Sequence, residues 1–451
     1  MNIGIIRMRY NPYGGAEVFV SRFVGELLKR GHTCHIFAAK WEENISPSPE
    51  SPPVTPLSGV KGGEVSLIPS PPAGEGKGEG RFSGQNHASA SSKQGSKLIF
   101  HKIKTFGPSF LRLLTFAINS YFAVRKASLD IILSFDRTLY QDIYRAGDGC
   151  HKEWLIQRAK GKRQRAKGFY SMLYALYYVL NPLHLTLLYL EKRLFQSKSL
   201  KFVVANSNRG KAEIIRHYKL PEEKICVIYN GIDLNQFDLN EKGKTRAVYR
   251  ERLGIKNETT LLFVGSGFER KGLRFLIEAL GTLKKESKVG SAPQKVQGQN
   301  GGQSPPNKLK LIVVGKGKNG KYQEIADRCG AGTDITFVGP VKDAQDYYYA
   351  ADIFVLPSIY EPFSNACLEA MASGLPVVTS RINGVSEILS DGKNGMIVED
   401  PADSEELASK IRPLLDREVR SAAGSMARQV AENYTIEKNV EEFLRLIEVA
   451  K

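Results

Sequence analysis

Two carboxylates, Glu361 and Glu369, flank an expected strand-to-helix turn with seven residues between them. Residues 353–358 form a short apolar run closed by Pro and Ser, which predicts a buried strand. Residues 366–373 are expected to form a helix that ends at Gly374. Such a turn offers free backbone N–H groups and a positive helix end at the carboxyl edge of a parallel sheet. The pattern favours a ligand with phosphates and hydroxyls, such as a sugar nucleotide, although the two carboxylates alone could be a loop residue and a solvated helix residue.

Adjacent cations follow another expected strand, at residues 261–264. A glycine-rich turn leads to Arg270 and Lys271, directly before a helix expected at 273–283. This pair suits a diphosphate, because Arg can bind it bidentately and Lys supplies a compact charge. Taken alone, the dipeptide is more typical of a solvated basic corner.

The first residues of the chain predict a βαβ unit, with strands at 2–6 and 32–38 around a helix at 16–30. Gly14 and Gly15 precede this helix and would let a phosphate approach the backbone closely. A plain tight turn has the same signature. The Gly-x-Gly-x-x-Gly dinucleotide fingerprint is missing here, which argues against a Rossmann oxidoreductase.

The composition is that of a globular protein with an anionic partner. The 451 residues predict two to three domains, and the formal net charge of +17 favours anionic lipid or phosphorylated substrates. No nucleic-acid-binding motif accompanies the charge. Five scattered cysteines fit a reducing compartment, and the N-terminus begins in a strand without a signal-peptide core. We therefore expect a cytoplasmic protein.

Taken together, the motifs resemble those of the retaining glycosyltransferases of family four, which have the GT-B fold. The resemblance rests on the Glu361–Glu369 element, on Ala370–Val378 after it, and on the turn Asn230–Asp233. Residues 144–154 resemble more specifically the lipopolysaccharide core glucosyltransferase I branch of the family. The resemblance covers essentially all of the chain outside two insertions. It implies an α/β protein with two Rossmann-like domains facing a cleft.

The resemblance also implies a role for each motif residue. Those expected to meet the donor phosphates are Gly14, Gly15, Arg270 and Lys271. Backbone groups near Val338 would meet the base, and the N–H groups of Phe363, Ser364 and Asn365 would hold the distal phosphate or the sugar. Glu361 would hold the sugar hydroxyls and Glu369 the ribose. Asp148 would bind a sugar hydroxyl or stabilise positive charge at the glycosidic carbon. Because the site segments lack an Asp-x-Asp motif, we expect Arg270, Lys271 and helix N-termini to replace a metal, and we expect no cofactor.

The same resemblance divides the chain into an acceptor-binding domain at 1–240 and a donor-binding domain at 245–430. A last helix, at 431–451, is expected to cross back to the first domain. Residues 44–96 and 287–307 are rich in Pro, Ser and Gly. Such segments cannot bury enough apolar surface to offset their ordering entropy, which predicts disordered insertions.

Basic and aromatic helices at 152–200 are expected to lie near a membrane. Residues 158–167 carry six basic residues and no acid, and residues 168–190 carry no charge and several tyrosines. Asn181–Pro182 interrupts the uncharged run. Two interpretations remain open: a buried helical hairpin with a solvated basic loop, or a monotopic patch on anionic lipid. The lipid-linked acceptors of the related enzymes favour lipid contact at the inner face of the cytoplasmic membrane.

The expected function is retaining transfer of a hexose, with glucose favoured, from a nucleoside-diphosphate sugar to a lipid-linked or lipopolysaccharide-core saccharide. A UDP-sugar is favoured as the donor, although the sequence fixes neither base nor sugar. The alternative within the class is a mannosyl- or N-acetylhexosaminyl-transferase of another glycolipid or polysaccharide pathway. Outside the class stand a nucleotide-dependent oxidoreductase and a non-enzymatic membrane-surface protein, which would leave the Glu361–Glu369 element unexplained.

Overall fold

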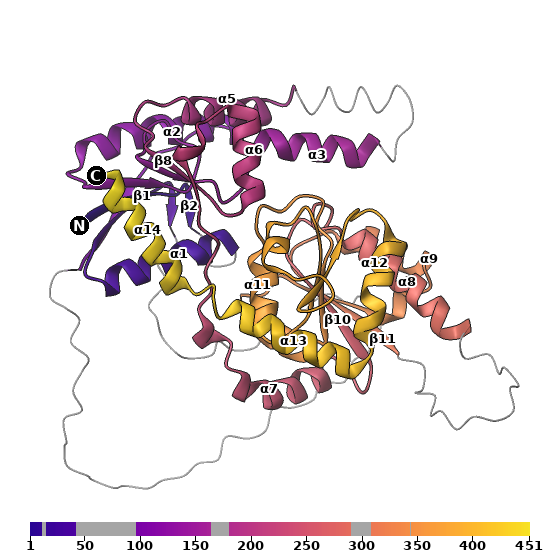
Figure 1. The fold of residues 1–451 in the computed structure, drawn as a ribbon. Helices are drawn as coiled ribbons and strands as arrows, with labels where there is room; N and C mark the ends of the chain where they lie inside the picture. The colour runs from indigo at the N-terminus through magenta and orange to yellow at the C-terminus, as the bar shows by residue number, and fades with distance from the viewer. Residues whose placement is uncertain (11–14, 42–95, 164–179, 290–307, 343) are drawn as a thin grey trace, which may run out of the picture.

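The computed structural model describes residues 1–451 apart from 11–14, 42–95, 164–179, 290–307 and 343. The described chain forms two α/β domains, each built on its own parallel sheet (Figure 1). The N-terminal sheet has the spatial order β5-β3-β1-β6-β7-β8-β9. In that order its strands are Leu98–Lys102, Thr33–Ala38, Asn2–Ile6, Ile131–Ser134, Ile143–Arg145, Phe202–Ala205 and Ile225–Val227. A short pair, β2 (Arg9–Tyr10) and β4 (Lys40–Trp41), stands apart from it.

The C-terminal sheet has the order β12-β11-β10-β13-β14-β15, and its strand pairs are all parallel. In that order its strands are Ile335–Gly339, Leu309–Val314, Thr259–Val264, Ile353–Leu356, Val377–Ser380 and Gly395–Val398. Every residue of β13, β14 and β15 is buried. Parallel sheets are covered by crossover helices on both faces, which explains why these strands are continuous apolar runs.

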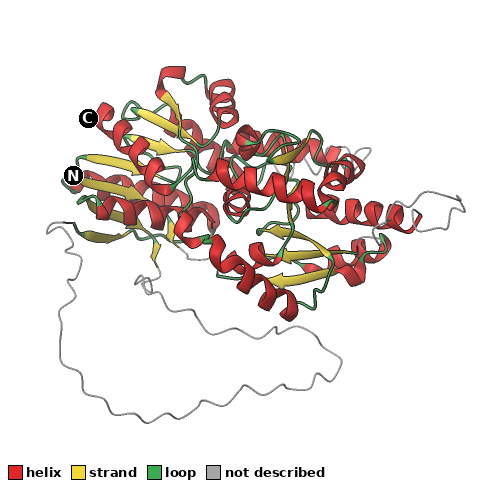
Figure 2. Ribbon diagram, turned by 60° about the horizontal axis from the view of Figure 1, so that its bottom comes forward, coloured by secondary structure: helices red, strands yellow, loops and turns green. Residues whose placement is uncertain are grey.

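The helices of the two domains flank the sheets, as Figure 2 shows. Those of the N-terminal domain are α1 (Gly15–Lys29), α2 (Ser109–Lys126), α3 (His151–Arg163), α5 (Pro182–Phe195) and α6 (Asn208–Tyr218). Those on the C-terminal side are α7 (Leu239–Arg252), α8 (Leu273–Val289), α9 (Asn319–Arg328), α10 (Gln345–Ala350), α11 (Asn365–Ala372), α12 (Ser404–Ile411) and α13 (Arg417–Ala431). The predicted fold class, two Rossmann-like α/β domains, is confirmed.

The last helix, α14 (Ile436–Ala450), returns to the N-terminal domain and lies beside α1 (Figure 1). Its Phe443 ring meets the Phe23 ring edge-on, with 5.0 Å between centroids. The chain passes between the domains twice, near Ile232 and near Tyr434. Two backbone hydrogen bonds of 2.9 Å join these passages: Ile436 N–H donates to the Ile232 oxygen, and Ile232 N–H donates to the Tyr434 oxygen. The domains are therefore connected at two adjacent points.

Two boundaries differ from the sequence-based expectation. The division expected between residues 240 and 245 falls inside α7, which binds the C-terminal domain: Arg246 pairs with Asp352 at 2.7 Å. The second insertion was expected to begin at residue 287, yet α8 continues to Val289. Neither helix contains a Pro that would interrupt the helical pattern, and Gly290, directly after Val289, is the stop signal for α8 that the composition-based boundary did not use. Most of the expected insertions lie outside the described residues.

Candidate active site

The donor-side turn is set by the start of α11. Ser364 is the N-cap residue, and its hydroxyl accepts a hydrogen bond from Cys367 N–H at 3.3 Å. Gly374, with φ of 70°, follows the helix in the left-handed conformation that glycine adopts without strain. Between the strand β13 and this cap lie Tyr360, Glu361 and Pro362. The local sequence thus places Glu361 just before a helix N-terminus at the carboxyl edge of the sheet.

A second turn, after β10, brings two cations to the same place. Gly265 has φ of 143°, and a Cβ there would lie 2.6 Å from Cδ of Lys271. Gly272 has φ of 78°, and a Cβ there would lie 1.9 Å from the Pro357 carbonyl oxygen. Glycine is required at both positions because the Lys271 side chain and the loop after β13 occupy the space. The glycine-rich turn therefore aims Lys271 across to the neighbouring strand end.

Glu361, Arg270 and Lys271 form one ion-paired cluster. Glu361 Oε2 lies 2.9 Å from Arg270 Nη1 and 2.9 Å from Lys271 Nζ. Arg270 also donates to the Tyr360 carbonyl at 3.0 Å. The side chains of Glu361 and Lys271 are 12% and 10% exposed, whereas Arg270 is 35% exposed. The cluster is thus mostly withdrawn from water, with Arg270 at its rim.

The electrostatics of this cluster keep Glu361 charged. Burial raises the pKa of Glu361, but the charges of Lys271 and Arg270 and the hydrogen bonds they donate outweigh it, so the pKa falls below its usual value. Glu361 therefore carries a full negative charge near neutral pH. A ligand phosphate that binds the two cations would therefore replace one anion, the Glu361 carboxylate, with another.

Asn365 and Glu369 lie on α11 and face the N-terminal domain. They line a narrow cavity of about 10 Å³ together with Leu368, Gly231, Ile232 and three residues of α1: Val18, Phe19 and Arg22. Glu369 Oε2 accepts from the Tyr348 hydroxyl at 2.9 Å. The two carboxylates of the predicted element are therefore held by different partners, Glu361 by cations and Glu369 by a tyrosine.

Asp148 comes from the other domain, in the turn between β7 and α3, and its side chain is exposed. Its charge interacts electrostatically with three arginines, Arg7, Arg137 and Arg145, and favours their charged form. Burial lowers the pKa of Arg145 to about 10, with Asp148 acting against that shift. Asp148 is therefore an accessible carboxylate in an arginine-rich surrounding.

A cavity of about 250 Å³ lies at the carboxyl ends of β1 and β6. Its charged lining includes Arg7, whose Nη atoms lie 3.0 Å from Glu17 and 3.3 Å from Asp136. Its remaining lining residues are Met8, Arg9, Ser109, Leu113 and Leu183. Burial disfavours the charged form of Arg7, but Asp136, Asp148 and Glu17 outweigh it and raise the Arg7 pKa. The cavity is slightly smaller than typical pockets for drug-sized ligands, which begin at ~300 Å³. Its mixed polar and apolar lining therefore suits a small ligand.

The remaining predicted residues are placed as follows. Gly14 lies outside the described residues, and Gly15 is the first residue of α1. Val338 lies in β12, at the edge of the sheet, where the register with β11 shifts next to Gly339. Phe363 is 4% exposed and packs on Tyr229, with 5.7 Å between ring centroids, so only its backbone is suited to a ligand. The structure joins Glu361, Arg270 and Lys271 directly, and it leaves Val338 without a contact to them.

Several site-forming residues were not singled out from the sequence. Asn230 was interpreted as part of an architectural turn, yet its side-chain amide donates to Asn365 Oδ1 at 2.6 Å and accepts from Arg145 at 2.6 Å. Tyr360 stands directly before Glu361 and contacts Glu213 and Cys150 of the other domain. Adjacency to Glu361 was the one available signal for Tyr360, because its partners lie 147 and 210 positions away.

Among the described residues, no cluster of three or more His, Cys, Asp or Glu side chains could hold a metal ion. His151, at the start of α3, lies 3.2 Å from His184 and stacks on Trp154. Burial, with the charge of Arg137, lowers the pKa of His151 to about 4. This histidine is neutral near pH 7.

Comparison with known families agrees with this architecture. Residues 13–236 match the profile described as Glycosyltransferase Family 4, and residues 258–417 match the profile described as Glycosyl transferases group 1. The first match spans the N-terminal sheet from β3 onward, and the second spans the C-terminal sheet. The chain is a GT-B glycosyltransferase, and it belongs to family 4.

Individual relatives point the same way. Lipopolysaccharide glucosyltransferase WaaG of Escherichia coli is 28% identical over 306 residues, which cover 67% of this chain and 73% of WaaG. An uncharacterized glycosyltransferase of Methanocaldococcus jannaschii, MJ1607, is 32% identical over 200 residues, 44% of this chain and 46% of that protein. The chain thus spans about half the length of MJ1607.

Solved structures share the whole architecture. A crystal structure of WaaG superposes with a TM-score of 0.71 at 21% identity, covering 99% of both chains. Anabaena Alr3699/HepE in complex with UDP-glucose gives 0.64 at 16% identity, covering 100% of both. These likenesses establish the GT-B fold, and the Rossmann oxidoreductase considered from the sequence is set aside.

Proposed function

We propose that this glycosyltransferase transfers a hexose, with glucose favoured, from a nucleoside-diphosphate sugar to a lipid-linked or lipopolysaccharide-core saccharide, with retention of configuration. One observation carries the proposal: Arg270, Lys271 and Glu361 meet beside the N-terminus of α11. Two cations and a helix N-terminus suit a diphosphate, and a carboxylate between them suits sugar hydroxyls. The WaaG relative is named as a glucosyltransferase, and HepE was solved with UDP-glucose, which supports a UDP-sugar as donor.

In this proposal the cluster changes partners when the donor arrives. Arg270, at the exposed rim, and Lys271 then donate hydrogen bonds to the donor phosphates as well as to Glu361. Glu361 then accepts hydrogen bonds from the sugar hydroxyls, while Glu369 accepts from the ribose. The N–H groups of residues 363–365 hold the distal phosphate or the sugar, and the backbone near Gly15 and Val338 meets the phosphates and the base.

The chemistry requires no nucleophile from the protein. The bond between the anomeric carbon and the distal phosphate oxygen breaks, and a bond to the acceptor oxygen forms on the same face. The departing phosphate takes the proton of the acceptor hydroxyl. Arg270 and Lys271 stabilise the negative charge that develops on that phosphate, and Asp148 stabilises the oxocarbenium-like carbon. In this scheme the two side-chain cations serve the leaving group in place of a metal ion.

The acceptor would enter from the N-terminal domain. The 250 Å³ cavity offers two carboxylates, Glu17 and Asp136, beside the apolar side chains of Leu113 and Leu183. Carboxylates accept from sugar hydroxyls, and apolar groups cover the ring faces. Both carboxylates remain partly exposed, 18% for Glu17 and 26% for Asp136, although each pairs with Arg7. This supports a saccharide acceptor at the edge of β1 and β6.

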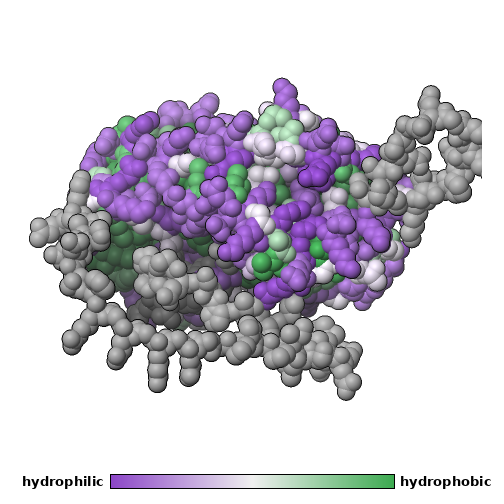
Figure 3. Space-filling view, turned by 90° about the horizontal axis from the view of Figure 1, so that it is seen from below, coloured by the Kyte–Doolittle hydropathy of each residue, from purple (hydrophilic) through white to green (hydrophobic). Residues whose placement is uncertain are grey.

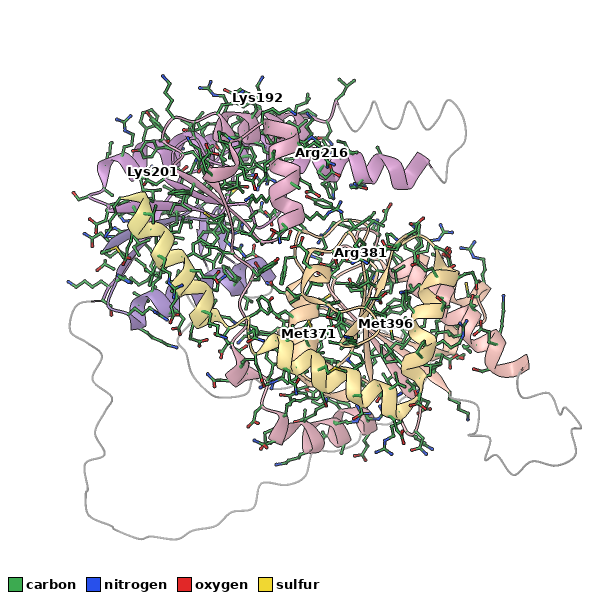
Figure 4. All side chains as sticks on the ribbon, viewed as in Figure 1. Lys192, Lys201, Arg216, Met371, Arg381 and Met396 are labelled. Carbon is green, nitrogen blue, oxygen red and sulfur yellow. The ribbon has the colours of Figure 1, made fainter. Side chains whose placement is uncertain are left out.

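We also propose that the N-terminal domain rests on the inner face of the cytoplasmic membrane, where a lipid-linked acceptor would lie. Apart from Arg158 and Ala159, the expected basic segment, 158–167, lies outside the residues whose side chains are described, and so do residues 168–179 of the uncharged run. In the described part, Leu185 and Tyr189 of α5 and Phe122 of α2 are exposed. Lys192 lies at the upper edge of the same domain in Figure 4.

No helix among the described residues has the length and apolarity needed to cross a bilayer. Figure 3 shows the molecule from below, a different face from that of α5, and this face is mostly hydrophilic with separate hydrophobic patches. Exposed aromatics beside basic side chains support peripheral attachment instead.

Changing the six basic residues of 158–167 to Gln should reduce sedimentation with anionic vesicles but not the weaker binding to neutral ones. The matched control changes six exposed basic residues of the other domain to Gln: Lys256, Lys285, Lys308, Arg328, Lys393 and Arg417. Unchanged sedimentation would support the solvated-loop interpretation.

A panel of UDP-, GDP- and ADP-sugars tests the donor. The expected result is a rise in melting temperature and slow hydrolysis with one UDP-hexose, and the loss of both in the Lys271→Met variant. A GDP-mannose or UDP-N-acetylhexosamine response would instead identify the alternative transferases. A response to none of the sugars, with the folded protein, would overturn the proposal.

A further inference from the structure

Asp148 and Glu361 belong to different domains, but the residues beside them in the chain touch. Cys150 N–H donates to the Tyr360 hydroxyl at 3.0 Å. A Cβ on Gly149, which has φ of +69°, would lie 2.4 Å from that hydroxyl and 2.5 Å from Pro362 Cγ. The Asp148 turn thus packs directly on the segment that carries Glu361, and only glycine permits so close an approach.

The Tyr360 hydroxyl has a partner on each side. It accepts from Cys150 N–H and donates to Glu213 Oε2 of α6 at 2.9 Å, and the Tyr360 side chain is buried. On the far side of the turn, Arg137 donates to the Gly149 carbonyl at 2.8 Å. The backbone next to Asp148 is therefore fixed by its own domain through Arg137 and by the other domain through Tyr360.

A second tyrosine, Tyr229, packs its ring on Phe363, but its hydroxyl bonds across the domains to Glu387 and contacts neither Glu361 nor Asp148. Tyr229 donates to Glu387 at 2.9 Å, and Glu387 also accepts from the N–H groups of Asn208 and Arg209 at the start of α6, each at 2.8 Å. This contact holds the same two domains together. It supplies a control for the effect of domain docking alone.

We propose that Tyr360 is a positioning residue, whose hydroxyl sets the Asp148 turn relative to Glu361 so that both carboxylates meet one donor sugar. The inference rests on the proposed function, because it requires that these two carboxylates act on the sugar. Transfer depends steeply on alignment, and a displacement of about 1 Å can cost roughly 100-fold in rate. The proposed contacts to the donor phosphates and ribose come mainly from the C-terminal domain. Tyr360 therefore affects turnover and leaves nucleotide affinity unchanged.

The test is Tyr360→Phe, which removes only the hydroxyl. We expect kcat to fall about tenfold, near the upper end of the effect of one neutral hydrogen bond, with the Kd for the nucleoside diphosphate unchanged. Tyr229→Phe, the matched interdomain control, should retain kcat. Glu213→Gln still accepts from the tyrosine and should retain most of the rate, whereas Glu213→Ala should match Tyr360→Phe.

Hydrogen exchange separates this inference from the proposed function, since it needs no substrate. The amide of Cys150 should exchange faster in Tyr360→Phe and at the wild-type rate in Tyr229→Phe. Faster exchange with a wild-type kcat would overturn the positioning role while the proposed function stands. Equal losses of kcat in the two tyrosine variants, or a weakened Kd in Tyr360→Phe, would also overturn it. If no donor sugar is used by the wild-type protein, the proposed function fails instead.

Discussion

The two domains hold their charges in opposite ways where they face each other. On the C-terminal side, the carboxylate of Glu361 is buried between Arg270 and Lys271 of its own domain. On the N-terminal side, a single buried cation, Arg7, pairs with two partly exposed carboxylates, Glu17 and Asp136, and Asp148 is exposed.

This difference suggests a division of labour. A cluster with two cations and one anion has positive charge to offer a diphosphate. Arginines that already pair with carboxylates have little free charge for a diphosphate, but their positive charge interacts favourably with the exposed carboxylate of Asp148. The C-terminal side is suited to the anionic part of the substrate and the N-terminal side to its hydroxyls and to developing positive charge.

Removing the excess positive charge should have the largest effect. Lys271→Met keeps the length of the side chain and leaves Glu361 paired with Arg270. We expect kcat to fall roughly 10²–10³-fold, the range for loss of one charge-stabilising donor. Steady-state kinetics measure this, and thermal unfolding checks that the variant folds. Arg274→Met, on an exposed cation in the first turn of α8, is the control. Near wild-type turnover in Lys271→Met would remove the phosphate role.

Removing the exposed carboxylate on the N-terminal side should have a smaller effect of a different kind. Asp148→Asn should lower kcat about tenfold to 100-fold and leave the nucleoside diphosphate Kd unchanged, since the carboxylate faces the sugar and not the phosphates. Glu223→Gln makes the same charge change at an exposed position of the same domain and should be silent. If Asp148→Asn weakened nucleotide binding, the two sides would not be divided as proposed.

The same comparison explains how far the sequence could predict the molecule. Local patterns predicted the fold, because apolar runs such as those of β13 and β14 alternate with segments of helical periodicity. Glycine-rich turns marked the strand ends. The clustering of Arg270 and Lys271 with Glu361 was foreseeable, because parallel strands end at one edge of a sheet.

The contacts between the domains were not foreseeable in the same way. Asn230 meets Asn365 across 135 positions, and Tyr360 meets Glu213 across 147. No periodicity links residues so far apart, and each is an ordinary residue of a turn or helix in its own segment. The attachment of α7 could not be predicted for a related reason: the helix is polar and only weakly amphipathic, and it contacts the C-terminal domain through ion pairs such as Arg246–Asp352.

The ribose assignment gives the next prediction in size. Glu369→Ala should weaken nucleoside diphosphate binding about tenfold, the worth of a hydrogen bond to a charged acceptor, without a large change in kcat at saturating donor. Tyr348→Phe removes only the hydroxyl that orients Glu369 and should weaken binding less. Isothermal titration with the nucleoside diphosphate measures both. Unchanged affinity in Glu369→Ala would contradict the assignment and leave Glu361 as the sole functional carboxylate of the element.

The smallest expected effect concerns Glu213, the carboxylate that joins α6 to Tyr360. Burial raises the pKa of Glu213 to about 7 from its usual 4.5, against the opposing charges of Arg209 and Arg216 and the hydrogen bond from Tyr360, and with Glu153 adding to the rise. Because the folded protein holds this proton more tightly, its contribution to stability is fully present below about pH 4.5 and is lost as the pH rises through about 7.

Glu213→Gln stays neutral and should lack this loss. Between pH 5 and pH 8, the wild-type melting temperature should therefore fall by roughly 2–10 °C relative to that of the variant, because the raised pKa of Glu213 corresponds to on the order of 1–3 kcal/mol over this interval. Differential scanning calorimetry at several pH values measures the difference, which cancels titrations common to both proteins. Parallel curves would mean that Glu213 is ionised in the folded state. Tyr360 would then donate to a charged carboxylate at all of these pH values. At pH 5, Tyr360→Phe should in that case lower the free energy of unfolding by more than the loss of a neutral hydrogen bond does.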